Sequence, residues 1–199
     1  MVRSYYSRVQ RIGLFGGSFD PIHTGHLLLG QAAIEELNLM RLCFILAAQS
    51  PFKVGQNFAP AETRLQMLRL ALAGRANCDV DEQEISRGGV SFAIDTVRDY
   101  ARRYPQGELF YLIGADHVAN LPKWREAGEL AKLAEFVVIP RPGTDSVTVP
   151  PPFRGRTLNG FAFGVSASQI RARVKAGQTI EHLVPPAVVE AVRNNGLYL

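Results

Sequence analysis

The stretch GLFGGSFDPIHTGHLLLGQAAIEEL, residues 13–37, contains the transition that decides the fold. An apolar, β-rich run (11–17) ends in two glycines, and a run rich in leucine, alanine and glutamate (26–39) follows with helix-favouring spacing. Two imidazoles, His23 and His26, stand three residues apart between these runs. The stretch therefore predicts a strand that turns into a helix, with both histidines at the turn.

The same alternation of strand-like and helix-like runs continues along the chain. We expect further strands over 42–48, 78–85, 108–114 and 135–141, and helices over 61–74, 91–104 and around 124–133. A Pro- and Gly-rich stretch, 141–156, is typical of a surface connection, and the tail from about 165 to 199 predicts two short helices separated by a Pro-Pro break. This pattern predicts an α/β protein with a mostly parallel sheet that helices cover on both faces. No boundary is visible, so we expect one domain over 1–199.

Composition narrows the class of protein. The 199 residues are 47% hydrophobic and 20% charged, which argues against disorder. The net charge of +4 is spread along the chain without a basic stripe, which argues against a nucleic-acid-binding protein. Cys43 and Cys78 have no CxxC spacing and predict two reduced core thiols. The N-terminus has no apolar signal region and no run approaches the roughly 20 residues of a membrane span, so we expect a cytoplasmic protein that binds no membrane.

The histidine turn has the residues that a phosphate site needs. Gly16 and Gly17 allow a close approach of the backbone to a ligand, and Gly25 leaves room for a flat group against the turn. His26 would fall in the first helical turn, where N–H groups and the helix dipole favour an anion. Imidazoles there can donate hydrogen bonds to phosphate oxygens. A metal site formed by the two histidines and Asp20 is the alternative, without a second Cys/His cluster to support it.

A second helix start lies late in the chain, in SASQIR (166–171). Ser166 followed three residues later by Gln169 is a capping-box pattern, which predicts an N-cap at Ser166. Arg171 near such a start is unexpected, because the helix dipole disfavours a cation there. An anion bound at this helix start would compensate. The alternative is an ordinary capped helix with no ligand.

These segments resemble those of a known family. GGSFDPIHTGHL (16–27) closely resembles the HxGH signature of the nucleotidyltransferase superfamily, in the form found in bacterial nicotinate mononucleotide adenylyltransferases. The resemblance continues, in family order, in EISRGGVSFAIDT (84–96), YLIGADHVANLPKWREAGEL (111–130), VVIPRPG (137–143) and VSASQIRARVKAGQTIEHLVP (165–185). It implies a Rossmann-like, doubly wound sheet with small C-terminal helices. The chain departs from the family at Phe52, where a histidine is usual, and at Ala167, which replaces the second serine of the (I/V)SSTxIR motif.

The resemblance also implies roles for individual residues. The catalytic group would be His23, His26 and Arg171. ATP and its phosphates would be bound by Gly16, Gly17, Ser18, Gly25, Lys53, Gly114, Asp116, Arg141, Ser166 and Ser168. Nicotinate mononucleotide would be bound by Phe92, Ala93 and Trp124, with the tryptophan stacked on the ring and backbone amides near Ala93 receiving the carboxylate.

The activity implied is adenylyl transfer from ATP to nicotinate mononucleotide in NAD biosynthesis, giving nicotinate adenine dinucleotide (deamido-NAD) and pyrophosphate. Mg²⁺ would bridge the substrate phosphates, so no acidic metal cluster is expected in the protein. The alternatives are another adenylyl- or cytidylyltransferase of the superfamily with a different phosphate acceptor, and a non-catalytic nucleotide-binding protein. The preference for the acid over the amide and the oligomeric state, including a homo-oligomer, stay open at this point.

Overall fold

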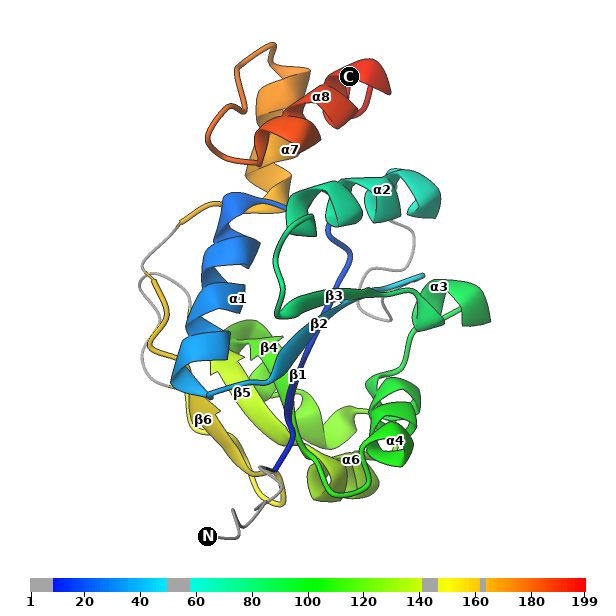
Figure 1. The fold of residues 1–199 in the computed structure, drawn as a ribbon, viewed down its shortest axis with the longest axis vertical. Helices are drawn as coiled ribbons and strands as arrows, with labels where there is room; N and C mark the ends of the chain where they lie inside the picture. Colours follow the sequence, from blue (N-terminus) through cyan, green and yellow to red (C-terminus); the bar gives the residue numbers. More distant parts are fainter. Residues whose placement is uncertain (1–8, 50–57, 141–146, 162–163) are drawn as a thin grey trace, which may run out of the picture.

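The structure is a computed structural model, and it describes residues 9–49, 58–140, 147–161 and 164–199. Its centre is one six-stranded sheet in the order β3-β2-β1-β4-β5-β6, in which every neighbouring pair is parallel (Figure 1). The strands are β1 (Arg11–Gly17), β2 (Arg41–Leu46), β3 (Cys78–Asp81), β4 (Glu108–Gly114), β5 (Glu135–Ile139) and β6 (Gly155–Thr157). This order confirms the predicted Rossmann-like, doubly wound sheet.

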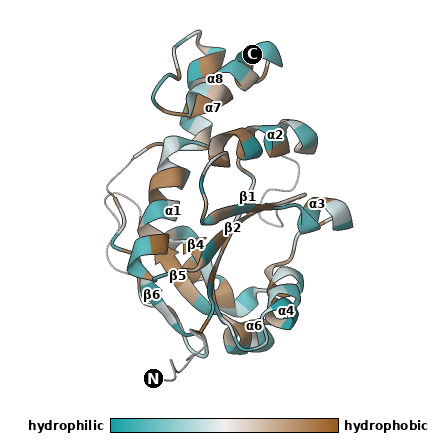
Figure 2. Cartoon of the chain, viewed as in Figure 1, coloured by the Kyte–Doolittle hydropathy of each residue, from teal (hydrophilic) through white to brown (hydrophobic). Residues whose placement is uncertain are grey.

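Helices cover both faces of the sheet, as predicted. They are α1 (Thr24–Glu36), α2 (Ala61–Leu72), α3 (Gln83–Arg87), α4 (Ala93–Arg103), α5 (Ala115–Val118), the 3₁₀ turn η1 (Leu121–Lys123), α6 (Ala127–Leu133), α7 (Ala167–Lys175) and α8 (Pro186–Asn194). Helices α1 and α2 lie on one face, and α4 and α6 lie on the other (Figure 1). Alternate strand residues therefore point into two separate cores, with Phe15 and Phe44 in the first and Leu14 and Ile45 in the second. The strands carry many of the most hydrophobic residues (Figure 2).

The C-terminal helices pack on the α1–α2 side of the molecule. Helix α8 contacts α2, and its buried residues Val188 and Val192 join the first core (Figure 1). The backbone N–H of Thr24 donates to the carbonyl of Leu183, so the start of α1 is bound to the segment between α7 and α8. In the described residues no helix is both long and apolar enough to cross a bilayer.

Several predicted boundaries differ from the structure. The strand predicted over 78–85 ends at Asp81, because its carboxylate accepts a hydrogen bond from the N–H of Gln83 at 2.7 Å and α3 follows. The stretch 141–156 was predicted as a connection only, but its last two residues begin β6, which lies at the sheet edge with all three residues exposed. Helix α6 starts at Ala127, three residues after Trp124, since the turn η1 occupies the preceding residues.

The cysteine prediction is correct for pairing and only half correct for burial. Both thiols are free, but Cys43 is buried whereas Cys78 is partly exposed. Burial raises the pKa of Cys43 to about 11, which keeps that thiol protonated at neutral pH.

Candidate active site

A cleft of about 1120 Å³ opens at the carboxyl ends of the strands, where the chain order reverses between β1 and β4. It is lined by residues from β1, α4, β4, η1 and the start of α7. The predicted site residues that line it are Gly16, Gly17, Ser18, His23, His26, Phe92, Ala93, Gly114, Asp116, Trp124, Ser166, Ser168 and Arg171. Residues far apart in the chain therefore meet in one cavity, large enough for two nucleotide-sized ligands.

One predicted residue that the structure describes does not line the cleft. Gly25 is buried in the first turn of α1, and a role for it against a ligand stays a prediction. Lys53 and Arg141, together with the unusual Phe52, lie outside the described residues.

The two imidazoles stack at the start of α1. Their ring centroids are 3.6 Å apart with 26° between the planes. His23 is the N-cap and His26 lies in the first turn, as predicted, and the backbone N–H of His23 donates to Nδ1 of His26 at 3.2 Å. Because Nδ1 accepts this bond, the ring proton of His26 is on Nε2. His23 is 6% exposed, and burial lowers its pKa from 6.5 to about 4. His23 is therefore neutral at pH 7.

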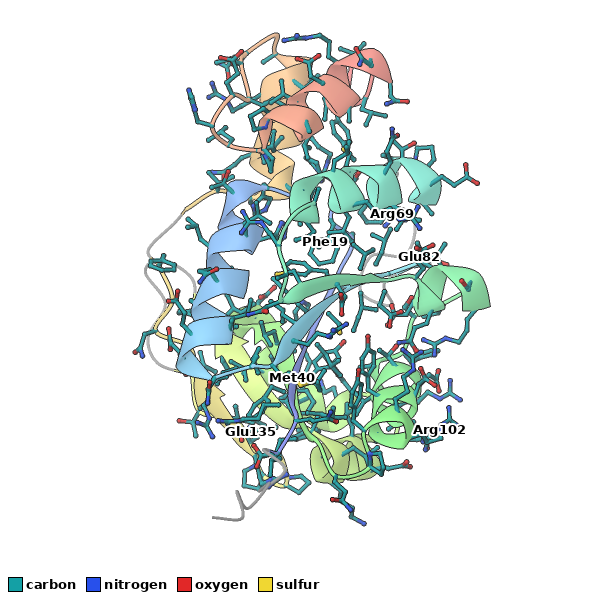
Figure 3. The ribbon with its side chains drawn as sticks, in the orientation of Figure 1. Phe19, Met40, Arg69, Glu82, Arg102 and Glu135 are labelled. Carbon is teal, nitrogen blue, oxygen red and sulfur yellow. The ribbon has the colours of Figure 1, made fainter. Side chains whose placement is uncertain are left out.

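Neighbouring side chains explain the glycines that precede the histidine turn. A Cβ at Gly17 would lie 2.9 Å from the ring of Phe19, and one at Gly16 would lie 3.1 Å from the hydroxyl of Tyr111. Phe19, which is labelled in Figure 3, is buried next to Gly17 and has a left-handed φ of +43°. Its ring meets the ring of His26 edge-on, with the two centroids 5.1 Å apart. Gly17 thus makes room for Phe19 of the loop before the histidines, and Gly16 makes room for Tyr111 of β4. This close packing is additional to the predicted approach of a ligand.

The start of α7 has the predicted capping box. The N–H of Gln169 donates to Oγ of Ser166 at 3.3 Å, and the N–H of Ser166 donates to Oε1 of Gln169 at 2.9 Å. Arg171 does not extend into solvent. Its guanidinium donates to Oγ of Ser168 at 3.2 Å and to the main-chain carbonyl of Asp20 at 2.7 Å. The second helix start is thus bonded directly to the loop between β1 and α1.

Two buried ionic residues support that loop: Asp20, which the sequence suggested only as a ligand in the alternative metal site, and Arg64, which it did not single out. Asp20 is 2% exposed, and its carboxylate accepts hydrogen bonds from the hydroxyl of Tyr198 at 2.6 Å and from the N–H of Ala59 at 3.3 Å. Arg64 of α2 is 3% exposed and donates to three main-chain carbonyls, those of Ser18, Ala47 and Ala59, at 2.9–3.0 Å. We call Asp20, Arg64, Arg171 and Tyr198 the Asp20 cluster. The cluster contains two guanidiniums and one carboxylate. Because the main-chain carbonyls that Arg64 binds carry no formal charge, the excess positive charge is not neutralised within the cluster.

The opposite end of the cleft is aromatic. Trp124 is partly exposed, and its inner edge packs against Tyr111 and Phe136 at centroid distances of 6.1 and 6.2 Å. Arg125 lies over the ring of Phe92 at 4.9 Å and also faces Asp95 at 3.7 Å. A flat, apolar surface next to a cation and next to the start of α4 is suited to an aromatic ring that carries a negative substituent.

Glu84 is a further cleft residue that sequence reasoning missed. It is 5% exposed, accepts a hydrogen bond from the hydroxyl of Thr96 at 2.6 Å, and burial raises its pKa. No sequence pattern separates it from the other acidic residues of 79–84. Asp116, also predicted, lies in the first turn of α5 and not at its N-cap, 3.7 Å from Nε2 of His117.

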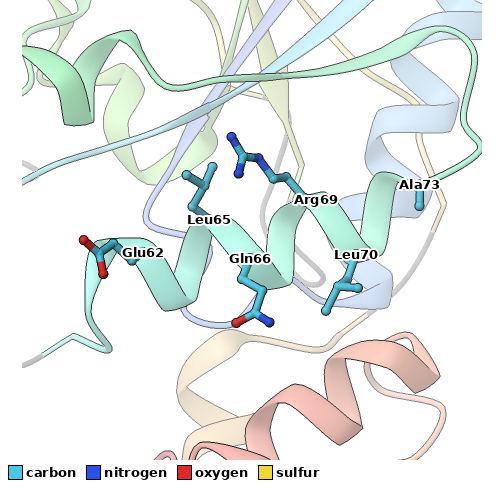
Figure 4. A pocket seen from close by; sticks show the side chains of 6 residues that line it. All are labelled: Glu62, Leu65, Gln66, Arg69, Leu70 and Ala73. Atoms are coloured by element: carbon cyan, nitrogen blue, oxygen red, sulfur yellow. The ribbon is translucent and has the colours of Figure 1, made fainter.

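The alternative of a metal site at the histidine turn finds no support. Oδ1 of Asp20 accepts from Tyr198 and Ala59 and Oδ2 faces Arg171 at 3.9 Å, and nowhere in the described ranges do three His, Cys, Asp or Glu side chains gather as metal ligands. A separate shallow hollow on α2, formed by Glu62, Leu65, Gln66, Arg69, Leu70 and Ala73, contains none of the predicted site residues (Figure 4).

Comparison with known proteins identifies the class first. A sequence model of the family described as cytidylyltransferase-like matches residues 14–173, which include both helix starts of the cleft. The doubly wound sheet and its cleft have the form of a nucleotidyltransferase. Among solved structures, Plasmodium falciparum nicotinic acid mononucleotide adenylyltransferase in complex with NaAD has a TM-score of 0.77, with 17% identity, over 95% of this chain and 97% of that one. That likeness supports the fold.

Closer relatives identify the family. A probable nicotinate-nucleotide adenylyltransferase of Thermus thermophilus is 42% identical over 188 residues, covering 94% of this chain and 99% of the relative. One of Geobacillus kaustophilus is 39% identical over 188 residues, covering 94% and 86%. The chain belongs to the nicotinate-nucleotide adenylyltransferase family, which confirms the resemblance of its motifs.

Proposed function

We propose that this protein transfers the adenylyl group of ATP to the 5′-phosphate of nicotinate mononucleotide and releases deamido-NAD and pyrophosphate. The observation that carries the proposal is the meeting of two helix starts, at His23 and at Ser166, in one cleft with an aromatic end. The names of the relatives support the same activity.

The attacking group is already an anionic phosphate, so the reaction requires no general base and no covalent intermediate. Catalysis then depends on alignment of the two phosphates and on stabilisation of charge at the α-phosphorus. We assign His26 to the stabilisation of the charge at the α-phosphorus, since its Nε2 carries the ring proton and is a hydrogen-bond donor. His23 is neutral before substrate binds, so its contribution is a hydrogen bond and not a fixed charge. Arg171 and the N–H groups at the start of α7 would hold the leaving pyrophosphate.

Mg²⁺ fits this site as an ion held by the substrates. Oδ1 of Asp20 accepts hydrogen bonds from Tyr198 and Ala59, Oδ2 lies 3.9 Å from the guanidinium of Arg171, and the described residues form no cluster of three metal ligands. Phosphate oxygens and water would therefore supply its coordination shell. The ion would neutralise part of the phosphate charge, while the protein residues bind and orient the phosphates.

The aromatic end of the cleft supports the acid as the preferred acceptor. Phe92 begins α4 without a side-chain cap, which leaves helix N–H groups to receive an anion. Arg125 brings a guanidinium to the same end, where it also faces the carboxylates of Asp95 and Glu126 at 3.7 and 3.6 Å. A neutral carboxamide would gain less from both features than a carboxylate.

A side-by-side assay tests the proposed activity. Purified protein is incubated with ATP and Mg²⁺ and with either nicotinate mononucleotide or nicotinamide mononucleotide, and the dinucleotide and pyrophosphate are measured. We expect faster turnover with the acid. Release of pyrophosphate only with a different phosphate acceptor would indicate another transferase of the superfamily. ATP binding without turnover on any acceptor would indicate a non-catalytic nucleotide-binding protein.

A further inference from the structure

The residue next to the last one, Tyr198, reaches into the active-site loop. Its side chain is partly buried against the first core, and its hydroxyl donates to Oδ1 of Asp20 at 2.6 Å across 178 positions of sequence. The backbone has a left-handed φ of +64° at this non-glycine residue. Such a conformation is retained when surrounding contacts determine it.

Asp20 connects this tyrosine to the phosphate end of the cleft. Its main-chain carbonyl accepts the hydrogen bond from Arg171 at 2.7 Å, and its Oδ2 lies 3.9 Å from the same guanidinium. Asp20 follows directly on Phe19, whose backbone is left-handed and whose ring packs edge-on against the ring of His26. A shift of the Asp20 main chain would therefore move the carbonyl that Arg171 binds and the neighbouring Phe19 that packs on His26.

The hydroxyl of Tyr198 remains a hydrogen-bond donor to the carboxylate of Asp20 at neutral pH. Burial, with the hydrogen bond to Asp20 as a second cause, raises the pKa of Tyr198, so the hydroxyl stays protonated in the neutral range. A hydrogen bond to a buried carboxylate contributes more than one between neutral groups, and its loss leaves Oδ1 with the longer bond from Ala59.

We propose that Tyr198 is a positioning residue for the ATP half of the reaction: its hydroxyl holds Asp20, and Asp20 holds Arg171 and the loop before α1 in place for the polyphosphate. The inference rests on the proposed function for the identity of the nucleotide. The aromatic end of the cleft is formed by α4 and the η1 turn, and neither contributes to the Asp20 cluster. Loss of the Tyr198 hydroxyl should therefore weaken the binding of ATP and leave the binding of the mononucleotide unchanged.

The test is the variant Tyr198→Phe, which keeps the ring and removes the hydroxyl. A matched control is Tyr100→Phe, because Tyr100 also donates to a buried aspartate, Asp81, at 2.5 Å, and neither residue lines the cleft. Calorimetric titration gives the dissociation constants of ATP and of nicotinate mononucleotide, and steady-state kinetics gives KM for each. We expect Tyr198→Phe to weaken ATP binding about five- to tenfold and to change mononucleotide binding less than about twofold. Tyr100→Phe should lower Tm and leave both affinities within about twofold.

Measuring the dissociation constants of both ligands distinguishes a positioning role of Tyr198 from a purely structural one. A loss of folded protein lowers the active fraction but does not change either dissociation constant. Unchanged ATP affinity in Tyr198→Phe, or an equal loss for both ligands, would overturn the proposal. Turnover of the unmodified protein tests the proposed function separately, since the ratio of ATP affinities between variant and parent is measured without any product.

Discussion

The buried, neutral state of His23 makes a quantitative prediction about acid stability. In the folded protein its pKa is lowered from 6.5 to about 4, because the ring is 6% exposed. Between these two values the unfolded chain binds a proton at His23 and the folded protein does not. Folding stability from this residue is therefore complete above pH 6.5 and is lost as the pH falls toward 4.

The expected magnitude follows from the two pKa values. Proton linkage at one site gives a loss of about 2 kcal/mol in the free energy of unfolding between pH 7 and pH 5. Urea denaturation of the parent protein and of His23→Gln at both pH values measures it. Each protein is compared with itself at the two pH values, so any stability change that the substitution causes at pH 7 cancels. The contributions of His117 and His182, which are present in both proteins, cancel when one loss is subtracted from the other.

We expect the parent protein to lose about 2 kcal/mol more than His23→Gln on acidification. An equal loss in both proteins would refute the reasoning, since it would mean that His23 takes up its proton in the folded state as readily as in the unfolded chain. The conclusion that His23 is neutral in the folded protein at pH 7 would then be wrong.

Three further substitutions test other parts of the site. Trp124→Ala should raise KM for nicotinate mononucleotide at least about tenfold and change KM for ATP less than about twofold, because in the proposed arrangement the ring stacks on the mononucleotide only; equal effects on both would remove it from the ring pocket. Arg125→Gln should lower the preference for the acid over the amide about three- to fivefold, as expected for a half-exposed charge, in a competition assay with both mononucleotides. Gly17→Ala should lower the free energy of unfolding by about 1–3 kcal/mol, since its Cβ would lie 2.9 Å from the Phe19 ring; unchanged Tm would show that the ring can move.

The sequence predicts those parts of the site that depend on local patterns. The capping box at Ser166 and the helical position of His26 follow from residues within one turn, and the structure confirms both. Strand β6 has three exposed residues and no apolar alternation, so periodicity does not reveal it. The bond between Tyr198 and Asp20 joins distant segments, and only the folded chain shows it. The roles of the individual site residues in binding and catalysis stay predictions.

The net charge of the Asp20 cluster has a consequence for the pH dependence of polyphosphate binding. Arg171 faces the carboxylate of Asp20 at 3.9 Å, and Arg64, which interacts with the same carboxylate electrostatically, is bonded only to main-chain carbonyls, so the cluster carries one positive charge in excess. Guanidinium groups do not titrate near neutrality, even though burial lowers the pKa of Arg64. Capture of a polyphosphate from solution can thus be insensitive to pH across the range in which imidazoles ordinarily gain and lose protons. Recruitment of the nucleotide and its chemical activation would then respond to acidity through different side chains.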